Sequence, residues 1–385
     1  MAILSNFNMP KILIAPLDWG LGHTTRCIPI IKALLANSCR VVVSCNTEQQ
    51  NLLLQEFNNV EFLFLEGYNI KYASNPKLLP ISIIGQLPTI NKAIKYEHQW
   101  LDKIIENNNI DLVISDNRYG LYSNKIPCIF ITHQLTIKAS FLFIERWLQK
   151  INYQFINCYK ACWVPDFSSD NNIAGMLSHP TKMPTIPVHY IGPLARFDKA
   201  TSIINCQSSM VEINTNHKFK NTNYIYDCCI LLSGPEPQRT VLEKMILVDI
   251  NNIKAKILLV RGKPGSIEKL QGYNGVEIKN HLVGNELQQA IQQSEFIISR
   301  SGYTTIMELL SLQKKAILIP TPSQTEQEYL GTRLMNQRWC YSISQQNFNL
   351  KNAISEAKNF DYKLPNLEHT SLQNFITNFL KSTFK

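Results

Sequence analysis

The chain has 385 residues, which is enough for two domains of ordinary size, each with its own core. Hydrophobic residues make up 45% of it and charged residues 17%, which excludes a disordered chain and a long single helix rich in charged residues. The 38 Lys and Arg against 29 Asp and Glu leave a net charge of +9. This modest excess is spread along the chain. It fits a partner with phosphates or an anionic surface and does not single out nucleic acid.

The first half alternates short apolar runs with helical patterns, as a parallel sheet covered by helices requires. Strands are predicted at 11–16, 40–45, 60–65, 111–115, 127–132 and 161–165. Helices are predicted at 27–35, 48–57, 83–107 and 137–159. The continuous apolar runs at 111–115 and 127–132 are typical of strands buried on both faces.

A polar stretch at 202–223, rich in Asn, Ser and Lys, separates this series from a second one. In the second half, strands are predicted at 226–233, 256–260, 276–279, 296–299 and 316–319. Helices are predicted at 236–247, 287–293, 305–312 and 326–337. We therefore predict an α/β protein of two doubly wound, Rossmann-like domains with an interdomain cleft at the carboxyl ends of the strands.

The predicted boundaries follow the same pattern. The first domain spans 1–192, a linker or excursion spans 193–223, and the second domain spans 224–364. The segment 365–385 is expected to return to the first domain as a helix.

The ten cysteines show neither C-x-x-C spacing nor a zinc-finger pattern with histidines, so we expect buried thiols in a reducing compartment. The N-terminus has no basic segment followed by an apolar one, and no apolar run approaches the roughly 20 residues of a spanning helix. We expect a cytoplasmic protein, with peripheral contact at the inner face of the cell membrane as a further option.

The first strand-to-helix turn carries the first candidate site. Gly20 and Gly22 allow a tight turn and close backbone approach, and His23 and Thr24 fall at the helix start. The third glycine of the dinucleotide fingerprint is replaced by Thr25, which weighs against an NAD-dependent oxidoreductase. His23 is a candidate general base, the alternative being a helix-capping histidine.

Two further strand ends belong to the same edge of the first sheet. Asp116 follows a buried strand and is a second candidate base, its alternative being a structural or acceptor-positioning role. His133 lies at the end of the next strand, where it either binds an acceptor or is a loop histidine. Gly22, Thr24, Arg118 and His133 are assigned to the acceptor side.

Three turns of the second half suit a sugar nucleotide. In 299–309, Ser301, Gly302, Thr304 and Thr305 surround a helix start that suits a diphosphate, and Glu308 can accept two ribose hydroxyls. The alternative for Glu308 is a carboxylate favoured by the helix dipole.

The other two turns add amides, carboxylates and arginines. Gln324, Gln327 and Glu328 suit sugar hydroxyls, against the alternative of a solvated helix start. Ser233, Gly234, Gln238 and Arg239 open the second domain, where Arg239 and backbone amides can meet phosphate. Arg196, near the end of the first half, can reach a diphosphate.

Taken in order, these segments resemble glycosyltransferase family 28, most specifically over 299–329, which is similar to the family's R-S-G-x-x-T-x-x-E helix and its Q-Q-Y-like helix start. The resemblance implies the glycosyltransferase-B fold, with the donor nucleotide held by the C-terminal domain.

The resemblance also implies residue roles. Gly302, Tyr303 and Thr305 would line the nucleotide site, Glu308 would bind the ribose, and Gln327 and Glu328 would contact the donor sugar. Ser233–Gln238, Arg196 and His23 would match the family's G-G-S-Q-G loop, G-N-P-V-R arginine and G-G-H histidine. The chain departs from the family at 233–238, which reads S-G-P-E-P-Q, and at Glu328, where the family has a second glutamine; this puts an N-acetylglucosamine preference in doubt.

These observations together predict an inverting, metal-independent hexosyltransferase. No D-x-D motif occurs, so no metal site is expected, and no cofactor is expected beyond a nucleotide-sugar co-substrate, UDP-linked in our interpretation. The expected acceptor is a glycan or a lipid-linked acceptor, with a role in cell-envelope glycoconjugate synthesis, and nucleic acid is not an expected partner. The apolar and basic segments 78–99 and 137–159 either dock on anionic membrane or pack on the sheet.

Three alternatives remain open at this point. A nucleotide-sugar epimerase of the same fold would use the same nucleotide site without an acceptor. A non-catalytic nucleotide-sugar binding protein and the oxidoreductase are the other two.

Overall fold

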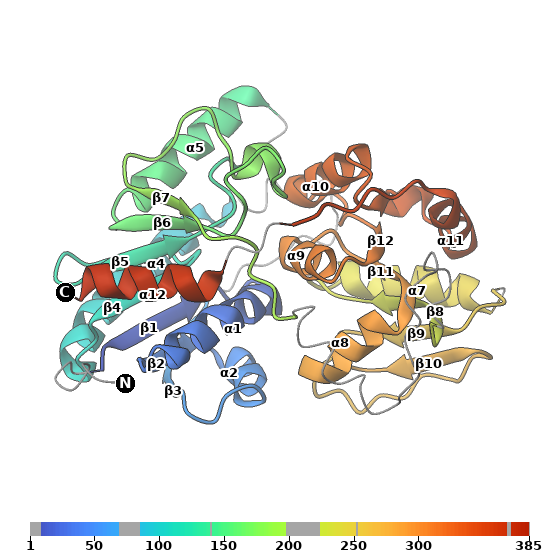
Figure 1. The fold of residues 1–385 in the computed structure, drawn as a ribbon, viewed down its shortest axis with the longest axis horizontal. Helices are drawn as coiled ribbons and strands as arrows, with labels where there is room; N and C mark the ends of the chain where they lie inside the picture. Colours follow the sequence, from blue (N-terminus) through green and yellow to red (C-terminus); the bar gives the residue numbers. More distant parts are fainter. Residues whose placement is uncertain are drawn as a thin grey trace, which may run out of the picture. The chain divides into compact units, whose positions relative to one another are not determined.

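The computed structural model describes residues 9–68, 85–138, 141–197, 224–251, 253–367 and 371–384. The chain divides into two compact units, one of Met1–Leu194 with Glu368–Lys385 and the other of Ala195–Leu367. Each unit is a parallel sheet flanked by helices (Figure 1). Most of the linker expected at 193–223, and the start of the segment 78–99, lie outside the described residues.

The first unit contains a seven-stranded parallel sheet in the order β3-β2-β1-β4-β5-β6-β7. Its strands are β1 (Lys11–Pro16), β2 (Arg40–Cys45), β3 (Glu61–Phe64), β4 (Leu112–Asp116), β5 (Cys128–Ile131), β6 (Ala161–Val164) and β7 (Val188–Tyr190). The strands β1, β4, β5 and β6 are buried along their whole length. Burial on both faces explains why these strands are continuous apolar runs rather than alternating ones.

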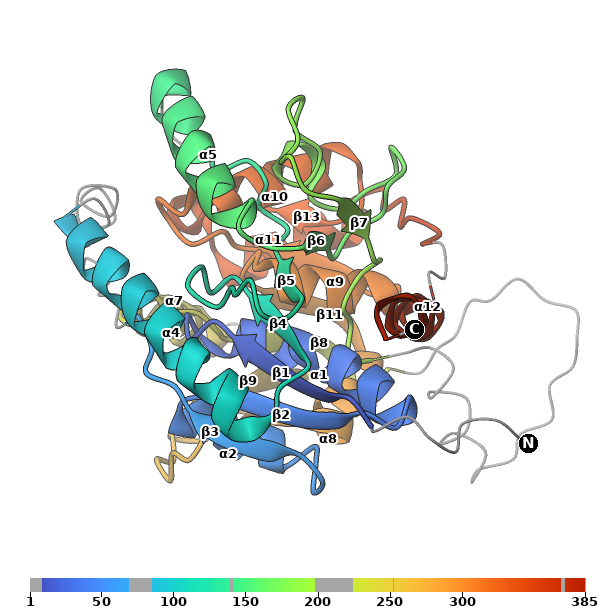
Figure 2. The same ribbon diagram turned by 90° about the vertical axis from the view of Figure 1, so that its left-hand side faces the viewer.

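Helices cover both faces of this sheet. They are α1 (Leu21–Ala36), α2 (Thr47–Leu54), α4 (Leu87–Asn108), α5 (Leu142–Ile156) and α12 (Leu372–Thr383), with a short 3-10 helix η2 (Gly175–Leu177). In Figure 2, α4 and α5 lie on one side of the sheet, and α1 and α12 lie on the other. Trp163 of β6 packs edge-on against Phe375 and Phe379 of α12, with ring centroids 5.1 and 4.9 Å away. The C-terminal helix is therefore part of the core of the first unit.

The second unit contains a six-stranded parallel sheet in the order β10-β9-β8-β11-β12-β13. Its strands are β8 (Tyr226–Leu231), β9 (Ile257–Val260), β10 (Val276–Lys279), β11 (Ser294–Ser299), β12 (Lys315–Leu318) and β13 (Tyr341–Ser342). Its helices are α7 (Gln238–Ile250), α8 (Gly284–Gln292), α9 (Tyr303–Ser311), α10 (Thr325–Asn336) and α11 (Leu350–Asn359), with a 3-10 helix η3 (Gln345–Asn347). One apolar cluster joins residues of the strands to residues of α7 and α11.

Both sheets confirm the predicted doubly wound α/β fold. In each, the strand order reverses beside the first strand, between β1 and β4 in the first unit and between β8 and β11 in the second. In open sheets of this kind, ligands bind outside the carboxyl ends of the strands at such a reversal. The functional candidates should therefore lie at these two edges.

Most of the described cysteines are buried, as predicted. Every described cysteine except Cys158 is buried, and all those described carry free thiols. Burial raises the pKa of Cys45 to about 12, so its thiol is inert near neutral pH. Cys158 is exposed, and Cys206 lies outside the described residues.

Candidate functional site

The carboxyl edge of the first sheet is shaped by a glycine turn. Pro16 at the end of β1 is in register with Asp116 at the end of β4. The turn after β1 reaches Gly20, which caps α1 with φ 78° and ψ 171°, a conformation that a side chain disfavours. The helix therefore begins at Leu21, earlier than the apolar pattern predicts, and His23 lies in its first turn above Asp116.

His23, Asp116 and Arg26 form one connected polar cluster. His23 Nδ1 lies 3.0 Å from Asp116 Oδ2, and Arg26 Nε donates to Oδ1 and Oδ2 of Asp116 at 3.0 and 2.9 Å. A further hydrogen bond runs from Arg26 Nη2 to the same carboxylate. Asp116 is fully buried, whereas the His23 side chain is 16% exposed. Of the three, His23 is the group that solvent reaches.

The charges in this cluster fix the protonation states. Burial by itself raises the pKa of Asp116, but the charges of Arg26 and His23 outweigh it and lower that pKa to about 2. Burial and the Arg26 charge lower the pKa of His23, although Asp116 acts in the opposite direction. An ionised carboxylate only accepts hydrogen bonds, so Nδ1 of a neutral His23 carries the proton and Nε2 holds the lone pair.

This geometry corrects the prediction that Asp116 itself is a candidate base. Its carboxylate is buried, ionised and occupied by Arg26 and His23, so it has no access to an acceptor hydroxyl. Its position instead matches the structural alternative, that of a group which orients another side chain.

Two of the predicted acceptor residues are also buried. Thr24 Oγ1 accepts a hydrogen bond from Gln49 Nε2 at 2.9 Å, and Gln49 also donates to the Leu17 carbonyl at 3.0 Å. His133 Nδ1 lies 3.2 Å from Arg26 Nη1, and only 4% of His133 is exposed. Thr24 and His133 therefore support the turn and Arg26, and their side chains do not face an acceptor. Gly22 is exposed beside His23.

Arg118 is a further correction. Its side chain is completely buried, and its Nε donates to Glu97 Oε1 at 2.7 Å. Glu97 Oε2 accepts from the Tyr68 hydroxyl at 2.8 Å and from the Gly120 amide at 2.9 Å. A fully buried guanidinium paired in this way holds the loop after β4 and cannot contact an acceptor.

The first turn of the second unit contains both exposed and buried predicted residues. Ser233 and Gly234 are exposed just after β8, and Gly234 has a φ of 101°. Arg239 is 3% exposed and pairs with Glu236 at 2.6 Å and with Glu243 at 3.3 Å. The prediction that Arg239 meets phosphate is therefore wrong, because its guanidinium is committed to neighbouring side chains.

Arg300 is a buried cation that the sequence analysis did not assign. Its Nη1 donates to the carbonyls of Ile319 and Pro320 at 3.2 and 3.4 Å, and its Nη2 donates to the Gln238 carbonyl at 2.8 Å. Burial lowers its pKa to about 10, and no ion pair among the described residues includes it. Arg300 thus joins the ends of β11 and β12 to the start of α7 and places a positive charge beneath this edge.

The helix α9 carries the most specific motif of the sequence. Gly302 caps its N-terminus, Ser301 Oγ donates to the Gln327 carbonyl at 2.9 Å, and Tyr303 is buried. Thr304 and Thr305 are half-buried in the first turn. The helix begins two residues before the predicted 305 because Gly302 serves as the cap.

Two of the predicted donor residues contact each other. Arg196 Nε donates to Glu308 Oε1 at 2.5 Å, and Arg196 Nη2 donates to Glu308 Oε2 at 3.2 Å. Both belong to the second unit. Glu308 is therefore the counter-ion of this arginine. Burial and the Arg196 charge also lower the pKa of His281.

The start of α10 is organised by its own side chains. Gln327 Oε1 accepts from the Thr321 amide at 3.0 Å, and its Nε2 donates to Gln324 Oε1 at 2.5 Å. Glu328 is exposed, and its Oε1 accepts from the Ser323 amide at 2.9 Å. The loop after β12 is thereby held next to α9, through the contact of Ser301 with Gln327.

Comparison with known proteins gives a match for most of the second unit. Residues 239–382 match the glycosyltransferase family 28 C-terminal domain. The second unit therefore resembles the C-terminal domain of glycosyltransferase family 28. Two curated relatives from Clostridium botulinum are named UDP-N-acetylglucosamine--N-acetylmuramyl-(pentapeptide) pyrophosphoryl-undecaprenol N-acetylglucosamine transferase. The strain Kyoto relative is 28% identical over 155 residues, which is 40% of this chain and 42% of that protein. The strain Loch Maree relative is 28% identical over 109 residues, or 28% of this chain and 30% of that one.

The chain thus spans less than half the length of these curated relatives, but solved structures match it over nearly its whole length. The glycotransferase of kitacinnamycin has a TM-score of 0.60 at 12% identity, covering 98% of this chain and 96% of that one. Acinetobacter baumannii MurG has a TM-score of 0.53 at 12% identity, covering 97% and 100%. At these identities the structures show the fold, which is the two-domain fold of glycosyltransferases predicted from the family 28 resemblance.

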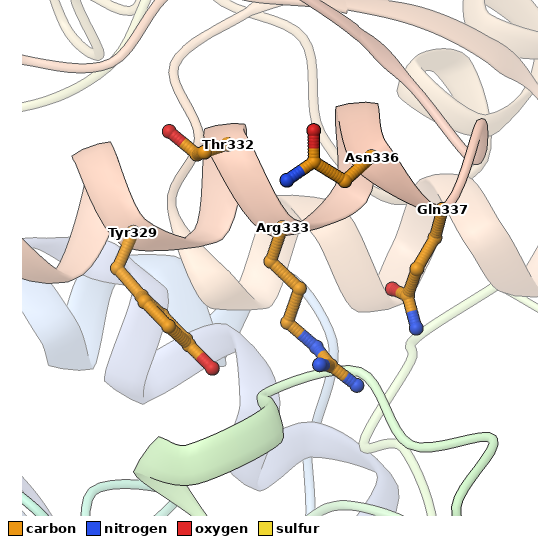
Figure 3. Close-up of a pocket in the computed structure, with 5 residues that line it drawn as sticks. All are labelled: Tyr329, Thr332, Arg333, Asn336 and Gln337. Carbon is orange, nitrogen blue, oxygen red and sulfur yellow. The ribbon is translucent and has the colours of Figure 1, made fainter.

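A cavity of about 270 Å³ lies on α10, and Tyr329 at the end of the 299–329 segment is one of the residues that line it. Figure 3 shows its lining, which consists of Tyr329, Thr332, Arg333, Asn336 and Gln337. Four of the five side chains come from α10 and the fifth belongs to its C-cap residue, Gln337, and none is in the predicted donor set. The cavity therefore lacks groups converging from several strand ends, as a sugar-nucleotide site requires.

The described ranges contain neither a candidate metal centre nor a membrane-spanning helix. Within them, no three His, Cys, Asp or Glu side chains are grouped so as to hold a metal ion. No helix in the same ranges is long and apolar enough to cross a membrane. Sequence reasoning missed Arg26, Gln49 and Arg300 as organisers of the two edges. For Arg26 and Gln49 the only sequence signal is a polar side chain inside or next to an apolar segment, whereas Arg300 is the first residue of the R-S-G-x-x-T-x-x-E segment.

Proposed function

We propose that this chain transfers a sugar from a nucleotide-sugar donor, UDP-linked, to an acceptor hydroxyl with inversion and without a metal ion. The observation that carries the proposal is the partly exposed His23, held through Nδ1 by the buried, ionised Asp116 at the carboxyl edge of β1 and β4. The family 28 match over 239–382 supports a nucleotide-sugar donor.

In the proposed reaction, His23 Nε2 removes the proton of the acceptor hydroxyl. The acceptor oxygen forms a bond to the anomeric carbon, while the bond between that carbon and the diphosphate oxygen breaks. The electron pair leaves with the nucleoside diphosphate, and one displacement inverts the anomeric centre. Asp116 stays ionised and stabilises the His23 imidazolium, in the way that a carboxylate supports a catalytic histidine elsewhere.

The second unit provides neutralising groups for the leaving diphosphate. The N-terminus of α9 favours negative charge, and Arg300 adds a buried positive charge to the same edge. In this proposal these groups neutralise the diphosphate in place of a divalent metal ion. The sequence has no D-x-D motif, whose two acids would bind such an ion. Glu308 is the proposed ribose ligand, and Gln327 and Glu328 are the proposed sugar ligands.

A ligand screen tests the donor proposal. Thermal unfolding is measured in EDTA with UDP, GDP and TDP, their sugars, and NAD. We expect a UDP-sugar to stabilise the protein, by about 2.7 kcal/mol at a concentration of 100 Kd. Stabilisation by no nucleotide at millimolar concentration would sink the proposal, and stabilisation by NAD alone would favour an oxidoreductase.

The anomeric configuration of a product, read by NMR, distinguishes inversion from retention, and conversion of the sugar nucleotide without an acceptor indicates an epimerase.

We further propose that the first unit docks on anionic membrane next to a lipid-linked acceptor. Phe141, Leu142, Phe143 and Trp147 are 50–72% exposed at the start of α5, and Arg146 and Lys150 are exposed on the same helix. The buried residues of α5 all lie in its second half, and in Figure 2 one end of the helix extends beyond the sheet. Large apolar side chains with neighbouring basic ones are suited to the interface of an anionic bilayer.

Vesicle binding tests the membrane contact. The triple variant Leu142→Ser, Phe143→Ser, Trp147→Ser is expected to bind phosphatidylglycerol-containing vesicles at least about tenfold more weakly, because each apolar side chain contributes up to a few kcal/mol when buried. The matched control Val248→Ser, Ile267→Ser removes side chains of the second unit that are 75% and 95% exposed, and should bind as the wild type does. Equal binding by the triple variant, or none by the wild type, contradicts the contact.

A further inference from the structure

The carboxylate proposed to bind ribose is fully engaged within the protein. Both oxygens of Glu308 accept hydrogen bonds from Arg196, one from Nε and one from Nη2. The side chains are 7% and 11% exposed, and the Arg196 guanidinium also lies 4.8 Å from the ring centroid of Phe197. This is a two-point, charge-assisted contact with little solvent access, which is among the stronger polar contacts in proteins.

Arg196 and a bound ribose would compete for Glu308. Two ribose hydroxyls would need the same carboxylate oxygens that Arg196 now fills. A neutral nucleoside that displaced Arg196 would break its ion pair with Glu308 and offer no charge in exchange, which is unfavourable where water has little access. A diphosphate on the same nucleoside offers the displaced guanidinium new negative oxygens, to which arginine binds well.

We infer that Arg196 and Glu308 form a latch that is closed in the nucleotide-free protein and opens only for a ligand carrying both a ribose and a phosphate. On binding, Glu308 exchanges Arg196 for the ribose hydroxyls, and Arg196 exchanges Glu308 for the phosphate. The latch thereby makes the site selective for nucleoside diphosphates over nucleosides. The inference rests on the proposed nucleotide-sugar function.

Calorimetry with uridine and with UDP tests the latch, because removing the arginine should move the two affinities in opposite directions. Arg196→Ala is expected to bind uridine about tenfold more tightly, since no ion pair has to open, and UDP about tenfold more weakly, since the phosphate loses a charged partner. Arg196→Lys keeps the charge without the two-pronged geometry and should fall between the wild type and Arg196→Ala for both ligands.

Two comparisons make the result specific. Arg338→Ala removes an exposed arginine of the same unit, which pairs with the exposed Asp361 at 2.5 Å, and should leave both affinities unchanged. In a Glu308→Gln background, where the latch has lost its anion, Arg196→Ala should no longer improve uridine binding.

The outcomes separate the latch from the function on which it rests. Uridine binding by Arg196→Ala and Arg196→Lys no tighter than by the wild type overturns the latch, including the case in which uridine binding is undetectable in all three. A parallel loss of uridine and UDP affinity also overturns it and makes Arg196 a support for the whole site. A wild-type protein that binds neither UDP nor a UDP-sugar overturns the proposed function itself.

Discussion

Replacing His23 with asparagine is expected to lower sugar transfer by about 10²- to 10⁴-fold, the usual contribution of a positioned general base. The asparagine amide can still donate to Asp116 from the place of Nδ1, but it has nothing in the place of Nε2 to accept a proton. The rate of transfer from a UDP-sugar under donor saturation measures the loss. UDP affinity should not change, because His23 belongs to the first unit and the proposed donor ligands belong to the second.

The same substitution at His189 is the control. His189 is exposed on β7, away from the Asp116 cluster, so His189→Asn should transfer sugar at the wild-type rate. A His23→Asn protein that keeps the wild-type rate removes His23 as the base. A variant that loses UDP binding instead assigns His23 to the donor.

The pH dependence of transfer gives an independent view of the same group. Burial and Arg26 lower the pKa of His23, so the neutral ring that accepts a proton is the main form at pH 7. The rate should be flat near neutrality and fall only below about pH 6.5, the ordinary pKa of histidine. An acid limb above this value would mean that another group controls the reaction.

The sheets could be predicted because their central strands are unambiguous. The runs at 111–115 and 127–132 are apolar throughout, and only strands buried on both faces read in this way. The edge strands β7 and β13 were missed because three and two residues leave no pattern to detect. The helix α11 was missed although Leu350, Ala353, Ile354 and Ala357 have helical spacing and are buried.

The candidate site was predictable in its positions and much less so in its contacts. His23 and Asp116 stand after different strands, 93 residues apart, and the parallel order of β1 and β4 brings them together. Whether a polar side chain at such an edge faces a ligand or a neighbour depends on its tertiary partners. Arg118 pairs with the buried Glu97, and Arg239 pairs with the buried Glu243. No local spacing in the sequence indicates the first of these pairs. Arg239 and Glu243 stand at i and i+4 on α7, so this pair had a sequence signal.

The second large effect is on stability. Asp116→Asn is expected to lower the free energy of unfolding of the first unit by about 3–5 kcal/mol, because it leaves Arg26 buried without an anion. Urea unfolding followed by tryptophan fluorescence measures this, since of the five tryptophans only Trp339 lies in the second unit. Asp111→Asn, at the other end of the same strand, is the matched control. Asp111 is exposed, and an asparagine oxygen can still accept the hydrogen bond from the Lys11 amide, so the change should stay within about 0.5 kcal/mol.

The pH dependence of this loss tests its electrostatic origin. The folded pKa of Asp116 is lowered to about 2, whereas an unfolded aspartate titrates near 3.9. The ionised carboxylate therefore contributes its full stability above about pH 4, and that contribution disappears as the pH falls toward 2. The difference between the wild type and Asp116→Asn should be constant near neutrality and shrink in this acid window. A difference that does not change down to pH 2 would assign the loss to packing rather than to charge. In that case, the charge of Asp116 would not be the reason why Arg26 is stable in the core beside the partly exposed His23.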